Sequence, residues 1–101
     1  MEIVNTFYSP DKKYKAIIYF YTGGGATVAD NVRVAVIPSS KKGAYDCDVN
    51  FSLNRADSSS VNANWESNDK LIISYKDYSD GVIKKDNKVG NINILYGNDI
   101  N

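Results

Sequence analysis

Apolar and polar residues alternate with a period of two along most of this chain, the pattern of β-strands that bury one face. Between residues 47 and 53, for example, Cys47, Val49 and Phe51 alternate with polar residues. The same alternation recurs at 32–36, 61–66, 71–76 and 92–96, and shorter apolar runs lie at 2–8 and 82–83. With the run at 14–21, the pattern predicts about eight short strands.

Residues 14–21, YKAIIYFY, carry apolar side chains on both faces of the strand that they predict. Ala16 and Ile18 share one face, while Ile17 and Tyr19 share the other. A strand that is apolar on both sides is typical of the interior of a sheet that is covered twice. We therefore expect a central strand here.

The segments between these runs are rich in the residues that form turns, namely Pro, Gly, Asn, Asp and Ser. They read SPDKK, TGGG, PSSKKG, NRADSSS, ESNDK, YSDG and KDNKVG. Many short strands at this spacing indicate an all-β fold, an antiparallel β-sandwich or a flattened barrel. The 101 residues show no internal repeat or linker, so we expect a single domain over residues 1–101.

Charge and cysteine content narrow the range of partners. Twelve basic residues balance twelve acidic ones, so the chain lacks the broad positive field that attracts nucleic acid. Cys47 is the single cysteine, which excludes an intrachain disulfide and a cysteine-rich zinc site. The N-terminal residues show no leader pattern, and no apolar run is long enough to span a bilayer. We expect a cytoplasmic protein that binds neither nucleic acid nor membrane.

The chain contains no histidine, which removes the commonest general base and the usual nucleophile pairs. We expect no enzymatic activity and no cofactor. Gly23 to Gly25 precede a strand pattern, not the helix that a phosphate loop needs, so a strand connection is the better interpretation. The run DCDVN lacks the glycine and glutamate of a calcium loop, because Phe51 and Asp57 stand at those positions. No metal site is expected.

Tyrosine is abundant, with eight residues, and most of these fit strand packing. Two tyrosines instead lie in predicted loops beside aspartates, a combination that can anchor a basic protein partner. The candidate partner-binding residues are Tyr45, Asp46, Asp48, Asp77, Tyr78 and Asp80. A solvated loop is the alternative at each position. Cys47, in phase with Val49, fits a buried structural thiol better than a reactive one.

The stretch SPDKKYKAIIYFYTGGGATVADNVRVAVIP, with W-x5-LIISY and NINILY after it, resembles a group of small bacterial all-β proteins that are mostly uncharacterised. The shared pattern is a Ser-Pro-Asp turn, an aromatic and aliphatic strand, a Gly-Gly-Ala-Thr turn and a Trp-to-Leu hairpin. It covers residues 8–37 and 61–96. The resemblance implies a type I turn at 9–11 and a Trp65 side chain in the core, and it identifies a fold more than an activity.

By type and size, the chain also resembles the immunity proteins of bacterial toxin systems, including contact-dependent growth inhibition. This resemblance implies a protein without catalytic machinery that forms a one-to-one complex with a cognate toxin domain, possibly a nuclease, and blocks its active site. The alternatives are a small-ligand or glycan-binding module and a structural, envelope-associated module. Aromatic side chains lined up on an exposed sheet face would favour the glycan alternative, and buried aromatic side chains would disfavour it.

Overall fold

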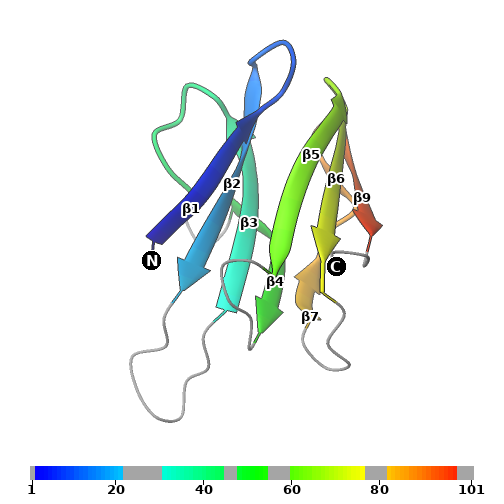
Figure 1. Cartoon of the computed structure of the whole chain (residues 1–101). Helices are drawn as coiled ribbons and strands as arrows, with labels where there is room; N and C mark the ends of the chain where they lie inside the picture. Colours follow the sequence, from blue (N-terminus) through cyan, green and yellow to red (C-terminus); the bar gives the residue numbers. More distant parts are fainter. Residues whose placement is uncertain (1, 22–30, 45–47, 55–59, 77–81, 98–101) are drawn as a thin grey trace.

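The computed structural model of the chain describes residues 2–21, 31–44, 48–54, 60–76 and 82–97. The described residues form two packed β-sheets, and no helix in them is long and apolar enough to cross a bilayer (Figure 1). The strands are β1 (Glu2–Tyr8), β2 (Tyr14–Tyr21), β3 (Asn31–Pro38), β4 (Val49–Asn54), β5 (Val61–Ser67), β6 (Lys70–Tyr75), β7 (Val82–Lys85), β8 (Lys88–Val89) and β9 (Ile92–Gly97). The predicted all-β sandwich is confirmed.

The first sheet has the strand order β1-β2-β3-β4-β7 and is antiparallel throughout. The second has the order β5-β6-β9-β8. Within the described residues β1 and β5 pair only within their own sheets, so the sheets do not close into the flattened barrel that was the alternative prediction. The predicted alternation sorts side chains correctly: in β6, Leu71 and Ile73 are buried while Ile72 and Ser74 are partly exposed.

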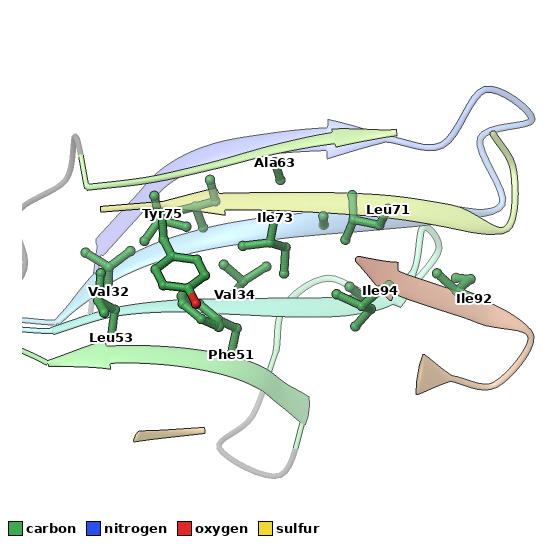
Figure 2. Close-up of a cluster of buried hydrophobic side chains, with 14 residues drawn as sticks. Val32, Val34, Phe51, Leu53, Ala63, Leu71, Ile73, Tyr75, Ile92 and Ile94 are labelled. Atoms are coloured by element: carbon green, nitrogen blue, oxygen red, sulfur yellow. The ribbon is translucent and has the colours of Figure 1, made fainter. Parts of the chain in front are cut away.

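The core lies between the two sheets and consists of aliphatic side chains around a cluster of aromatic rings, those of Phe51, Tyr75 and Tyr96 (Figure 2). Phe51 is fully buried, with its ring centroid 5.0 Å from that of Tyr75 and 5.6 Å from that of Tyr96. The ammonium of Lys85 lies 4.7 Å from the Tyr96 ring centroid and 3.3 Å from the Tyr75 hydroxyl. A cation over aromatic faces thus covers this side of the core, where β7 meets the second sheet.

The second sheet is mixed, whereas the first is antiparallel throughout. β6 and β9 run parallel, with Leu71 opposite Ile94. Parallel neighbours need a crossover, and here the chain crosses through the other sheet, because β7 pairs with β4 before β8 pairs with β9. β8 itself, at Lys88–Val89, was not predicted, since two residues are too few to show an alternation.

The corner between β7 and β8 is held by Asp86, whose backbone bonds to both sheets. Its N–H donates to the Asn50 carbonyl oxygen at 2.8 Å, and its own carbonyl accepts a hydrogen bond from the Tyr96 hydroxyl. Burial, together with the nearby Asp86 charge, raises the pKa of Tyr96, so its hydroxyl stays protonated and remains a donor. One short segment therefore ties the two sheets together along this side.

The outer face of the first sheet is also apolar over its interior strands, as predicted for residues 14–21. Ile17, Tyr19, Ala35 and Ile37 form a second buried cluster on this face, and Ala44 packs against it. The Ala44 N–H donates to the Tyr19 hydroxyl at 3.0 Å. Ala44, in the connection that follows β3, thus packs on an outer face whose apolar side chains are buried.

A β-bulge in β4 makes Asn50 a structural residue. Val34 faces Phe51 and Ala35 faces Val49, which leaves Asn50 as the extra residue. Its side-chain oxygen accepts a hydrogen bond from the Val36 N–H at 2.8 Å in a buried position. The Asn50 side-chain oxygen therefore gives the Val36 N–H the acceptor that the hydrogen-bond ladder between β3 and β4 does not supply at the bulge.

The substitution Asn50→Ala should lower the free energy of unfolding by about 1–3 kcal/mol, because it leaves the buried Val36 N–H without an acceptor. Asn62→Ala, at an exposed position on β5, is the matched control and should change it by less than about 0.5 kcal/mol. Chemical denaturation of the two variants measures the difference. Equal stabilities would show that the Val36 hydrogen bond contributes nothing net.

Candidate protein-binding surface

Five of the six predicted partner-binding residues, Tyr45, Asp46, Asp77, Tyr78 and Asp80, lie outside the described residues, as do Cys47 and the three consecutive glycines. The sixth, Asp48, is described. Its carboxylate forms an ion pair with Lys41, 2.6 Å from the ammonium nitrogen, and its side chain is 21% exposed. The Asp48 carboxylate is therefore already paired within the molecule, with a lysine that follows β3.

Asp48 also lies apart from the start of β7, the strand that follows residues 77–81. It precedes Val49, which pairs with Ala35 halfway along β3, whereas Val82 pairs with Leu53 near the far end of β4. Five residues of extended chain separate Asp48 from Leu53, roughly 15 Å. The structure does not bring Asp48 and the beginning of β7 together.

Exposed apolar side chains are concentrated on β1. In the described part of the chain five large hydrophobic residues are exposed, and three of them belong to this strand: Ile3, Val4 and Tyr8, with exposed fractions of 55%, 38% and 52%. We call these three side chains the β1 surface. The other two, Val82 and Leu95, lie singly on β7 and β9. Ile3 and Tyr8 lie five residues apart, roughly 15 Å, so the three side chains share one strand without forming one contiguous patch.

The pairing with β2 turns Ile3 and Tyr8 toward the same outer face. Ile3 lies opposite Tyr19 and Tyr8 lies opposite Lys15, and Tyr19 belongs to the outer cluster. Lys15 is buried along its stem, and its ammonium lies 6.0 Å from the Tyr8 ring centroid. The lysine thereby holds the exposed ring beside a positive charge.

The backbone edge of β1 is interrupted in two ways that hinder pairing with another strand. A bulge interrupts the register at Val4, and the Asn5 side-chain oxygen accepts the Thr6 N–H at 2.9 Å. The Trp65 indole N–H, from β5, donates to the Phe7 carbonyl oxygen at 2.8 Å. A partner would therefore contact the side chains of the β1 surface, not extend its sheet.

Trp65 differs in detail from the expectation that it fills the core. The indole is partly buried and packs against the core from the side where β1 and β5 come near each other. Its hydrogen bond to Phe7 links the two sheets along this side. The residue thus fixes the position of β1, which carries the exposed apolar group.

The turn after β1 is built around Ser9 and Asp11, in agreement with the expected Ser-Pro-Asp turn. The Lys12 N–H donates to the Ser9 carbonyl oxygen at 2.8 Å, closing the turn. The buried Ser9 hydroxyl donates to the Asp11 carboxylate at 2.7 Å, and the Lys13 N–H donates to the same oxygen at 3.1 Å. These hydrogen bonds, the Ser9 one foremost, lower the pKa of Asp11.

The described aromatic side chains do not form an exposed row. Tyr8 is the one exposed ring among those whose burial the structure describes, and the others are buried or partly buried. The outer face of the second sheet carries Asn62, Asn64 and Leu95 and no described aromatic residue. This arrangement disfavours the glycan-binding alternative. Nor do the described residues contain a group of three or more His, Cys, Asp or Glu side chains that could hold a metal ion.

The sequence contained a signal for the β1 surface that the period-two analysis did not use. The run EIVNTFY carries apolar residues at both parities, Ile3 and Phe7 on one and Val4 and Tyr8 on the other. The bulge at Val4 changes the phase midway, so Ile3 and Phe7 end on opposite faces. An edge strand with apolar residues at both parities leaves some of them exposed.

The substitution Ser9→Ala should raise the pKa of Asp11 toward its ordinary value, because it removes the strongest hydrogen bond to the carboxylate. The depressed pKa adds stability above the ordinary value, and this stability is lost as the pH falls through the folded-state pKa. NMR titration of the Asp11 carboxyl carbon measures the change. Ser39→Ala, which removes a hydroxyl bonded to the Lys12 carbonyl, is the control and should leave the titration unchanged. Identical Asp11 titrations in the two variants would contradict the assignment.

Comparison of the chain with protein-family models, with curated protein sequences and with solved structures finds no match.

Proposed function

We propose that this protein binds another protein through the β1 surface, and that the partner is a bacterial toxin domain for which it acts as the immunity protein. The observation that carries the proposal is the concentration of exposed apolar side chains on one edge strand, with Tyr8 beside the Lys15 ammonium. Tyrosine is among the residues that most often anchor protein interfaces. The toxin as partner rests on the resemblance in type and size to immunity proteins.

The β1 surface is suited to rigid recognition. Its strand is paired with β2 along its length, and Trp65 fixes it to the second sheet. Side chains held on a paired strand lose little conformational entropy when a partner covers them, so more of the contact energy appears as affinity. An interface of standard size, about 1,600 Å² in total, would extend well beyond the three residues and would cover neighbouring positions on the outer face.

The residues that the sequence predicts to bind the partner do not support this proposal equally. Asp48 already neutralises Lys41, so a partner would have to compete with that ion pair. The candidates outside the described residues, Tyr45, Asp46, Asp77, Tyr78 and Asp80, stay predictions from the sequence. We therefore place the anchors of the complex on β1 and leave the acidic residues as secondary contacts.

The double variant Ile3→Ser/Tyr8→Ser should weaken the complex with the toxin encoded next to this protein at least tenfold, because it removes two exposed apolar anchors. Binding is measured by calorimetry, and protection by rescue of cells that express the toxin. Leu95→Ser, an equally exposed apolar residue on β9 (46% exposed), is the matched control and should retain affinity and rescue.

Two results would contradict the proposal at different levels. Loss of binding in Leu95→Ser with full binding in Ile3→Ser/Tyr8→Ser would move the interface to the second sheet. Absence of both a complex and rescue with the unsubstituted protein would exclude the neighbouring toxin as partner and with it the immunity function.

A further inference from the structure

Two turns lie side by side at the end of the sandwich where β1 passes into β2. The Ser39 N–H donates to the Lys13 carbonyl oxygen at 2.9 Å, and the Ser39 hydroxyl donates to the Lys12 carbonyl oxygen at 2.6 Å. The second turn is closed by the Lys41 N–H, which donates to the Pro38 carbonyl at 3.0 Å. Backbone hydrogen bonds therefore fix the positions of both turns relative to each other.

These turns hold several lysines, and the exposed acidic residues Glu66 and Asp69 lie near them, because the Asp11 N–H donates to the Asn68 side-chain oxygen of the β5–β6 turn at 2.9 Å. The segments 9–15 and 39–44 hold five of the twelve basic residues of the chain and one of its twelve acidic residues. Lys12, Lys13 and Lys42 are exposed, and we call these three residues the basic end. Lys41 is engaged by Asp48, and the carboxylate of Asp11 accepts the hydrogen bonds that build the first turn.

The backbone of the first turn gives no reason for a lysine at position 12. Lys12 has a φ of 61°, the left-handed conformation that glycine adopts without steric cost. Among the described residues it is the one non-glycine with positive φ, and Gly90 adopts the same conformation elsewhere. Lys12 therefore carries a charged side chain at a position where glycine would be unstrained.

From this placement we infer that the partner presents an acidic protein surface to the basic end while its apolar residues cover the β1 surface. The two areas meet at Tyr8, which directly precedes the first turn and packs beside Lys15, whereas Ile3 and Val4 lie at the other end of β1. The inference rests on the proposed function and specifies the chemistry of the partner. Complementary charge beside apolar anchors orients a complex and excludes wrong partners.

Nucleic acid fits this site less well than an acidic protein does. Specific binders of duplex DNA typically neutralise about six to ten phosphates, more than three exposed lysines can reach. The apolar half of the combined surface would also contribute nothing to a phosphate backbone. An acidic protein surface with apolar residues beside it uses both halves.

The substitutions Lys13→Glu and Lys42→Glu should each weaken the toxin complex about three- to tenfold, and each should reduce the dependence of affinity on salt between 50 and 300 mM NaCl. Lys88→Glu makes the same change in charge at an exposed position on β8 in the second sheet and should leave the affinity unchanged. If all three variants bind like the unsubstituted protein, the inference is wrong while the proposed function stands.

Lys12→Gly separates binding from folding, because it removes the charge and relieves the left-handed backbone. We expect its melting temperature to rise by about 2–5 °C and its affinity for the toxin to fall. A raised melting temperature with unchanged affinity would remove Lys12 from the interface.

A probe that does not depend on the toxin tests the basic end directly. Poly-L-glutamate should shift the backbone amide NMR signals of residues 11–13 and 39–43, and the shifts should be lost in Lys13→Glu and retained in Lys88→Glu. Stronger binding of a 20-base-pair DNA duplex or of phosphatidylserine vesicles to the same residues would overturn the assignment to an acidic protein. Because this test uses no toxin, a failed toxin complex and a failed basic end can be told apart.

Discussion

The structure depends on one constraint: the two interior strands β2 and β3 are apolar on both faces, so the sheet that they form must be covered twice. The second sheet covers the inner face, with Val34 and Phe51 in the core. On the outer face, Ala44, in the connection that follows β3, packs on the outer cluster and donates to the Tyr19 hydroxyl. On the edge strand β1, Ile3 and Tyr8 are exposed.

The strands could be predicted well from the sequence because burial on one face of a sheet leaves a period-two pattern. The interior position of residues 14–21 could be predicted for the same reason, since both parities are apolar. Strand partners could not be predicted, because parity says which face is buried and nothing about the neighbour. The passage from β7 to β8 shows this: Asp86 lies at a corner between two sheets, and its backbone bonds to Asn50 and Tyr96 have no local signature.

The candidate site was harder to predict than the fold because exposure is not a property of residue type. Ile94 and Leu95 are neighbours on β9, yet the first is 3% exposed and the second 46%. Lysines differ in the same way: Lys15 and Lys85 lie against aromatic rings, while Lys12 projects from a turn. Residue type alone indicated the acidic loops as the binding site, yet Asp48, the described member of that set, forms an ion pair with Lys41.

The net charge of the chain determines its long-range electrostatic field, whereas the local arrangement of charges determines which partner surface fits at contact. A neutral chain has no long-range field to steer nucleic acid, but screening at physiological salt leaves interactions effective within about 8 Å. Ser39 holds the turns that carry Lys12, Lys13 and Lys42 next to each other. Since Tyr8 adjoins the same turn, apolar burial can supply affinity while the lysines decide which partner and which orientation are accepted. Both contributions require that the end of β1 and the turn after it keep one position. The hydrogen bonds of Ser9, Ser39 and Trp65 hold them there.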